Sequence, residues 1–215
     1  MNKQYELLIF DWDGTLINSE ANIVYCMQAA MSDLQLPVLS EDEIKNIIGL
    51  GLKEALTTLY ADIDIDTANQ LTDRYRFHFL TSEPSDPFQG VTETLTTLNE
   101  ADYFMAVATG KGRQGLDKAL SSTGYRSLFH TTRCADETRS KPHPQMLYEI
   151  LSFLGVEAEN ALMVGDTEYD INMAKNAGMD SIAVTYGVHE RERLAQCQPT
   201  TFIDSFAELI TWLDH

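Results

Sequence analysis

The chain is short of positive charge and has no long apolar run. Its 33 acidic residues against 15 Lys and Arg give a formal net charge of −18. This charge disfavours nucleic acid and anionic membrane surfaces as partners. No apolar run approaches the roughly 20 residues needed to span a bilayer, and the first residues lack a signal-peptide pattern. We therefore expect no nucleic-acid partner and no membrane partner.

Cysteine is also scarce, because Cys26, Cys134 and Cys197 are the only three and none belongs to a Cys-x-x-Cys pair. An odd number of cysteines without such a pair favours a reducing compartment, so we expect a cytoplasmic protein. Cys26 falls on the helical face of Ile23 and Ala30 and is expected to pack in a core. With 215 residues, the chain can form one domain, or one domain with an insert.

Two aspartates, Asp11 and Asp13, directly follow a short apolar run at residues 7–10. The run is too short for a core helix and predicts a buried parallel strand that ends near Gly14. Two carboxylates there repel each other unless a cation or a shared proton offsets their charge. Open α/β sheets also bind their ligands at this end of the strands. The pair therefore indicates a metal-assisted site, although an isolated Asp-x-Asp-Gly is equally typical of a simple turn.

The same pattern recurs at residues 161–164, where an apolar run is followed by Asp166 and Asp170. If the two strands are neighbours, four carboxylates meet at one edge of the sheet. Oxygen-only ligands suit a hard cation such as Mg²⁺, and the absence of His and Cys argues against zinc. Asp170 also falls in the first turn of an expected helix, where a negative charge is favourable without any metal. The candidate metal ligands are Asp11, Asp13, Asp166 and Asp170.

Two further loops offer groups that could bind an anion. The strand-like run at 104–108 leads to Thr109 and Gly110, where a hydroxyl and main-chain amides can cradle a phosphate. Lys141 stands in a loop stiffened by prolines, which suits a fixed positive charge. Taken alone, the Thr-Gly pair is also typical of an ordinary loop, and the lysine of a solvated surface.

Together these motifs resemble those of the haloacid dehalogenase-like hydrolase superfamily, and the resemblance covers essentially the whole chain. The spacing is similar to that of the phosphoglycolate phosphatase and β-phosphoglucomutase branch, which carries a helical cap between the first and second motifs. Asp13 departs from the dehalogenases proper, which lack this second aspartate and use no metal. The four motifs stand in order as Asp11-x-Asp13-Gly14-Thr15, Thr109-Gly110, Lys141-Pro142 and Gly165-Asp166-Thr167-x-x-Asp170.

From residue 88 onward, helical and strand-like segments alternate. This alternation predicts an α/β fold, a doubly wound parallel sheet with a Rossmann-like core. The expected strands are 7–10, 104–108, 129–134, 161–164, 181–185 and 201–203, and the expected helices are 91–99, 114–122 and 144–154.

Residues 18–82 differ, because no convincing strand falls among them. Four helices are expected there, the first capped by Asn18 or Ser19 and the last two at 52–60 and 67–80. An inserted α-helical cap domain is therefore expected in the α/β core. The expected division is 1–17 and 83–215 for the haloacid dehalogenase-like core and 18–82 for the cap.

The resemblance implies a Mg²⁺-dependent phosphatase that acts on a small phosphorylated metabolite. Asp11 would attack phosphorus and form an aspartyl-phosphate, while Asp13 would protonate the leaving oxygen and then deprotonate water. Mg²⁺ would be held by the Asp11 side chain, by Asp166 and by the main-chain carbonyl of Asp13. Asp170 would orient water or Lys141. The candidate catalytic residues are Asp11, Asp13, Thr109 and Lys141, and the candidate substrate-binding residues are Thr15, Gly110, Lys111, Gly51 and Lys53.

The turn at Gly49-Leu50-Gly51 is expected to join two helices of the cap. In capped members of the family, a loop at this place faces the active site, so Gly51 and Lys53 are candidates to touch the substrate. A purely structural turn explains the two glycines equally well. The expected oligomeric state is a monomer or a weak homodimer.

Two other functions stay open on the sequence. A phosphosugar mutase would use the same core and would need a second phosphate-binding group in the cap, for which Lys53, Arg74 and Arg76 are candidates. A catalytically silent binding protein of the same fold is the alternative from a different class. Net release of inorganic phosphate would separate a phosphatase from both.

Overall fold

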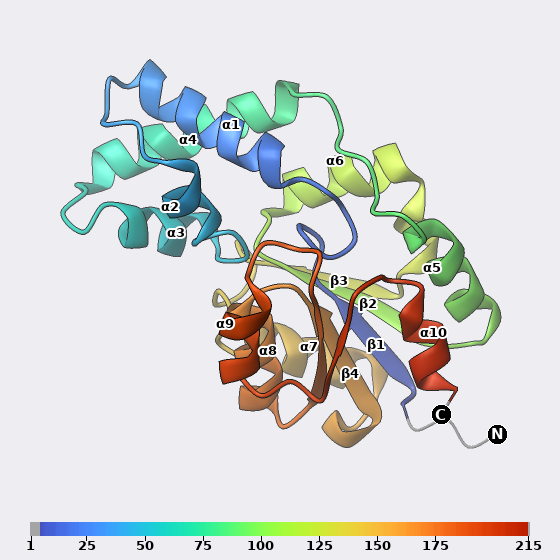
Figure 1. Cartoon of the computed structure of the whole chain (residues 1–215). Coiled ribbons are helices and arrows are strands. Elements are labelled where there is room, and N and C mark those ends of the chain that lie inside the picture. Colours follow the sequence, from blue (N-terminus) through green and yellow to red (C-terminus); the bar gives the residue numbers. More distant parts are fainter. Residues whose placement is uncertain (1–4, 215) are drawn as a thin grey trace.

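The computed structural model describes residues 5–214 and contains a six-stranded, fully parallel sheet. The strand order is β3-β2-β1-β4-β5-β6, so β1 lies inside the sheet between β2 and β4. Helices cover both faces of the sheet (Figure 1), which confirms the predicted doubly wound α/β fold. The strands are β1 Leu7–Phe10, β2 Phe104–Thr109, β3 Thr131–Cys134, β4 Ala161–Gly165, β5 Asp180–Val184 and β6 Thr201–Ile203.

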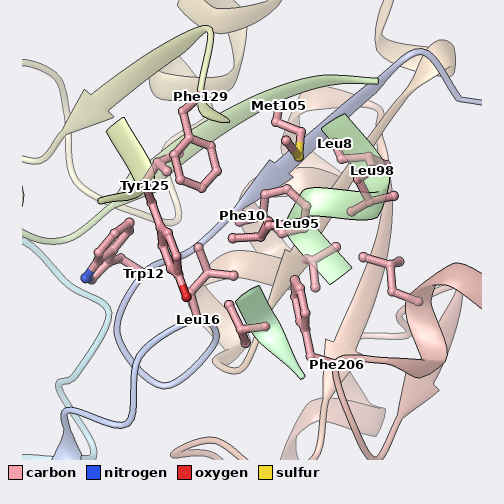
Figure 2. Close-up of a cluster of buried hydrophobic side chains, with 14 of the residues drawn as sticks. Leu8, Phe10, Trp12, Leu16, Leu95, Leu98, Met105, Tyr125, Phe129 and Phe206 are labelled. Carbon is pink, nitrogen blue, oxygen red and sulfur yellow. The ribbon is translucent and has the colours of Figure 1, made fainter. Parts of the chain in front are cut away.

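The inner strands are buried on both faces, because successive side chains of a strand point to opposite sides. Leu8 and Phe10 belong to one hydrophobic cluster, and Leu7 and Ile9 belong to another. Three helices cover the first cluster, part of which Figure 2 shows in close-up, and two cover the second. These are α5 Val91–Glu100, α6 Arg113–Thr123 and α10 Glu208–Leu213 on the first face, and α7 Gln145–Leu154 and α8 Glu168–Ala177 on the second, with the short α9 Arg191–Gln196 beside α8 and the 3₁₀ helices Tyr125–Leu128 and Ala158–Asn160 in loops.

The residue between the first two aspartates is an anchor in this core. Trp12 is fully buried, and its ring meets those of Tyr125 and Phe129 edge-on at centroid distances of 6.4 and 6.3 Å. Figure 2 shows Trp12 at one end of the cluster, with its indole nitrogen turned away from the other rings. Because an aromatic ring packed on two others has little freedom, it fixes the segment on which Asp11 and Asp13 stand.

Between β1 and α5 the chain forms four helices, here called the helical unit. The unit has a hydrophobic cluster of its own, which contains Met27, Met31 and Leu71. It lies beyond one end of the strands in Figure 1. The two chain segments that connect it to the sheet run side by side, since Ile17 bridges Pro87. Its helices are α1 Glu20–Asp33, α2 Glu41–Lys45, α3 Leu52–Leu59 and α4 Ile65–Thr81.

Some predicted element boundaries are wrong. Strand β3 begins at Thr131 rather than 129, because Phe129 turns into the first hydrophobic cluster. Helix α4 begins at Ile65 rather than 67, because the side chain of Asp64 accepts hydrogen bonds from the main-chain N–H groups of Asp66 and Thr67. Helices α9 and α10 are not predicted, since six residues are too few to show a helical period.

Two expectations from composition can be compared with the structure. Cys26 is fully buried, as its helical face predicts, and all three cysteines are free thiols. Among residues 5–214, no helix combines the length and the apolar character needed to cross a membrane.

Candidate active site

The carboxyl ends of β1 and β4 meet at one edge of the sheet. Phe10 is in register with Val164, so the residues that follow these strands, Asp11 and Asp166, come to the same place. The main-chain N–H of Asp11 donates to the carbonyl of Val164 over 3.0 Å, which holds the two strand ends together. Asp170 joins them from the first turn of α8. Three of the four carboxylates that were predicted to meet therefore do so, and Asp13 does not join them.

Three of these aspartates form a compact cluster, here called the carboxylate edge. Asp11, Asp166 and Asp170 each offer an oxygen, and these oxygens lie within 4.8 Å of one another. All three residues are at most 1% exposed. Asp166 is held by Thr15, whose hydroxyl donates to Oδ1 over 2.8 Å, and by the N–H of Val188, which donates to Oδ2 over 2.9 Å. The edge is thus a fixed group of acceptors rather than a mobile surface cluster.

Lys141 lies inside this edge, so the alternative of a solvated surface lysine is wrong. Its ammonium is 2.8 Å from Asp11 Oδ1 and 2.6 Å from Asp170 Oδ1, and its side chain is 0% exposed. Burial alone lowers the pKa of Lys141, but the charges of Asp11 and Asp170 outweigh it and raise that pKa above its usual range. Lys141 is therefore a permanent positive charge between two carboxylates.

The edge as a whole still lacks positive charge. One ammonium cannot neutralise three carboxylates, and burial raises the pKa of Asp11 well above its usual range and that of Asp166 to about 7. One buried oxygen, Oδ2 of Asp11, has no hydrogen-bond partner among the described residues. An unpaired buried oxygen in an all-oxygen cluster fits a hard divalent cation, so these residues can hold one.

Asp13 stands outside the three-aspartate cluster and has its own partners. Its Oδ1 accepts from the Ser19 hydroxyl over 2.5 Å and lies 2.8 Å from the Lys111 ammonium. Ser19, one of the two residues predicted to cap α1, is its N-cap, but its hydroxyl donates to Asp13 and caps no main-chain amide. The same Lys111 ammonium sits 4.0 Å above the ring of Phe79 in α4. Lys111 therefore connects Asp13 to the helical unit.

The glycines of the motifs allow very close approaches. Gly14 has a φ of +79°, and a Cβ added there would lie 2.1 Å from Asp166 Oδ2. A Cβ on Gly110 would lie 2.6 Å from the carbonyl oxygens of Gly49 and Leu50. Only glycine fits either position without moving the backbone that carries the site.

Thr109, the last residue of β2, is fully buried, and its hydroxyl accepts from the N–H of Lys111 over 3.2 Å.

A cavity of about 650 Å³ lies between the carboxylate edge and the helical unit. Among the described residues, the candidates fall into two groups. The lining does not include Thr15, Thr109, Lys141, Asp166 and Asp170, which are buried. Asp11, Asp13, Gly110, Lys111, Gly51 and Lys53 do line it, together with Arg76. Arg74 does not, because its guanidinium pairs with Asp33 on the outside of the helical unit.

Several site contacts have no counterpart in the sequence motifs. The loop after β5 supplies the Val188 N–H to Asp166, and its Tyr186 hydroxyl donates to the carbonyl of Thr15 over 2.9 Å. Ser140 accepts from the N–H of Gly51 over 2.7 Å. The available signal for the β5 loop was its place after a predicted strand, where ligands of open α/β sheets gather.

Comparison with known proteins bears on this geometry. The sequence model of the protein family described as haloacid dehalogenase-like hydrolase matches residues 8–184 of this chain. The chain belongs to this family. This membership confirms the resemblance stated on the motifs and the predicted class of hydrolase.

Relatives agree along almost the whole chain. The probable phosphatase IndB of Dickeya dadantii is 36% identical over 210 residues, which cover 95% of this chain and 91% of that protein. The phosphoglycolate phosphatase of Haemophilus influenzae is 30% identical over 227 aligned positions, which cover 99% of this chain and 100% of that protein. A crystal structure described as a predicted phosphoglycolate phosphatase from Haemophilus somnus has a TM-score of 0.90 at 27% identity and covers 99% of each chain. The relatives are named phosphatases, as the prediction of the enzyme class requires.

Proposed function

We propose that this chain is a Mg²⁺-dependent phosphatase that hydrolyses a small phosphorylated metabolite through an aspartyl-phosphate. The observation that carries the proposal is Asp11. It lines the cavity, one of its oxygens is held by Lys141, and its other oxygen is buried without a partner among the described residues. A carboxylate held in this way is oriented to attack and keeps one oxygen available for the reacting group or the cation.

Asp11 would attack phosphorus while the bond to the ester oxygen breaks, leaving the phosphoryl group on its carboxylate. Asp13, which also lines the cavity, would donate a proton to the leaving oxygen and then take one from the attacking water. The Ser19 hydroxyl and the Lys111 ammonium both contact its Oδ1 and so hold this carboxylate in position. Water attack on the phosphoenzyme would return Asp11 as a free carboxylate.

Mg²⁺ would be held by the side chains of Asp11 and Asp166 and the main-chain carbonyl of Asp13, with Asp170 behind them. When bound, the ion would supply positive charge against the phosphoryl oxygens and so relieve the deficit at the carboxylate edge. Lys141, the Thr109 hydroxyl and the Gly110 N–H would stabilise the remaining negative charge of the transferred group.

Residues 18–82 would act as a cap that covers the site and limits it to small substrates. Lys53 and Arg76 line the cavity on that side, and neither side chain has a hydrogen-bond or ion-pair partner among residues 5–214. Two unpaired cations facing a cavity favour a substrate with a second anionic group, such as a phosphorylated hydroxy acid. A small cytoplasmic metabolite of this kind agrees with the acidic net charge, which discourages larger polyanions.

The same two cations keep the mutase alternative open, because they could hold the second phosphate of a bisphosphorylated intermediate. The two functions separate by net release of inorganic phosphate.

The test is a phosphate-release screen over small phosphorylated metabolites and p-nitrophenyl phosphate. We expect release with Mg²⁺, loss of release with a chelator, and recovery when Mg²⁺ is added back. The Asp11→Asn variant is the control for contaminating phosphatases. Full activity in metal-free buffer would remove the metal from the proposal, and isomerised sugar phosphate without free phosphate would favour the mutase. A protein that turns over none of these substrates would be a silent member of the fold.

A further inference from the structure

One turn of the helical unit, at residues 46–51, lies directly on the loops that carry the site. The N–H of Gly51 donates to Ser140, the residue before Lys141. The carbonyls of Gly49 and Leu50 face Gly110 at a distance that leaves no room for a Cβ. These contacts seat the turn on the half of the sheet that contains β2 and β3.

Two side chains from the other half of the sheet hold the first residue of the same turn. Tyr169 Oη donates to the carbonyl of Asn46 over 2.8 Å, and Arg193 Nη1 donates to Asn46 Oδ1 over 2.6 Å. The second terminal nitrogen of Arg193 is 2.6 Å from Glu168 Oε1. The guanidinium is thus already oriented at the start of α8, so it loses little freedom when it binds Asn46.

These contacts lie far along the chain from the connections of the helical unit. The connections run through Ile17 and Pro87, and there Lys118 of α6 donates to the carbonyls of Leu80 and Ser82 over 2.6 and 3.0 Å. A body joined covalently at one place and by hydrogen bonds at another can pivot about the first when the second breaks. Loss of the contacts at Asn46 would therefore allow the helical unit to move away from the carboxylate edge.

We propose that Tyr169 and Arg193 are positioning residues that clamp Asn46 and so hold the turn at 46–51 over the carboxylate edge. Tyr169 directly precedes Asp170, so the clamp and the carboxylate share one helical turn. Closing the turn seats Lys53, at the start of α3, against the cavity. Its effect on turnover rests on the proposed function, whereas its effect on the turn does not.

The first test measures hydrogen exchange of peptides that cover residues 46–51. Tyr169→Phe removes only the hydroxyl, and Arg193→Ala removes the bond to Asn46. We expect each to speed exchange of this turn by about 2- to 10-fold, the equivalent of one ordinary hydrogen bond. Peptides from β1 and β4 should be unchanged.

Matched controls come from the same surfaces. Tyr148→Phe removes a hydroxyl that donates to the main-chain carbonyl of Asn176. Arg191→Ala removes an exposed ion pair between Arg191 of α9 and Asp204. Both should leave exchange at 46–51 unchanged. Equal acceleration in the controls, or none in Tyr169→Phe and Arg193→Ala, overturns the clamp.

A double variant tests whether Arg193 acts through Asn46. Asn46→Ala removes the Oδ1 acceptor, so Asn46→Ala combined with Arg193→Ala should exchange no faster than Arg193→Ala alone. Additive acceleration would show that the two side chains act separately and would overturn this link.

Steady-state kinetics distinguish a positioning role from a merely structural one, because a merely structural role would not change KM selectively. Loosening the turn should raise KM for the metabolite by about 2- to 10-fold, with kcat and p-nitrophenyl phosphate turnover nearly unchanged. Faster exchange with unchanged kinetics would overturn the positioning role. A parent protein without phosphatase activity would count against the proposed function and leave the exchange result to decide the clamp.

Discussion

The carboxylate edge and the helical unit are built in opposite ways. Strand β4, which leads to Asp166, buries all five of its residues, whereas α4 buries one residue of 17, Leu71. The charges at the edge are also buried, with Lys141 between Asp11 and Asp170, while Lys53 and Arg76 of the helical unit are exposed. Side chains pack against the carboxylate edge from every side. The helical unit is held by a small hydrophobic core of its own and by a few polar contacts.

The difference has a functional meaning. Charges in a dry, packed environment interact strongly and need little rearrangement during a reaction, which suits phosphoryl transfer. Exposed cations interact weakly until a ligand or a closing motion desolvates them. Chemistry is therefore expected to respond steeply to single substitutions at the edge, and substrate choice to respond gradually to substitutions in the helical unit.

The largest expected effect is at the edge. Asp11→Asn removes the nucleophile and should lower turnover by roughly 10⁴- to 10⁶-fold, as loss of a nucleophile does in other enzymes. Intact-mass measurement during turnover should show no phosphoenzyme adduct. An adduct of about 80 Da on this variant would mean that another residue is the nucleophile. An unchanged circular dichroism spectrum is the control that the variant is folded.

Asp13→Asn should have the next largest effect. It keeps the nucleophile but loses proton transfer, so turnover of a metabolite should fall by about 100- to 10,000-fold. With p-nitrophenyl phosphate, whose leaving group needs no proton, the phosphoenzyme should form and then hydrolyse slowly. An adduct missing from Asp13→Asn but present on Asp11→Asn would exchange the two roles.

A pair of leucine truncations tests the structural side of the comparison. Leu71→Ala and Leu8→Ala each remove a fully buried side chain, at a cost of about 2–5 kcal/mol. We expect Leu71→Ala to lower hydrogen-exchange protection in α1–α4 alone, and Leu8→Ala to lower it throughout. Uniform loss of protection in both variants would show that the helical unit and the sheet unfold as one.

The smallest expected effects concern substrate choice. Lys53→Ala and Arg76→Ala should each raise KM for a substrate with a second anionic group by about tenfold, and barely affect p-nitrophenyl phosphate. Arg74→Ala is the matched control, because Arg74 pairs with Asp33 away from the cavity. Equal effects on both substrates, or an equal effect of Arg74→Ala, would place specificity elsewhere.

Much of the fold and of the edge could be predicted because their signals are local. Leu7 to Phe10 are apolar without alternation, which already indicates a strand covered on both faces. Asp11, Asp166 and Lys141 stand in short motifs after such strands or in a stiff loop. Parallel strands that lie side by side must present their carboxyl ends together, so the convergence of these motifs follows from the topology.

The contacts of the helical unit could not be predicted in this way. Asn46 and Arg193 are polar residues in unremarkable surroundings, and nothing in their local sequence indicates a partner. The Ser19 hydroxyl has the position of a helix cap, yet it binds Asp13 instead. Such choices depend on which acceptor the fold brings nearer, and that is a property of distance in space.

The sequence by itself determined the α/β class, the place of the carboxylates at strand ends and the family, because periodicity and short motifs act over a few residues. Only the tertiary structure decided that Lys141 is buried between Asp11 and Asp170, that Lys111 joins Asp13 to Phe79, and which cations of the helical unit face the cavity. Charges become partners only when distant segments exclude water between them, and that exclusion arises from the packing of the whole chain.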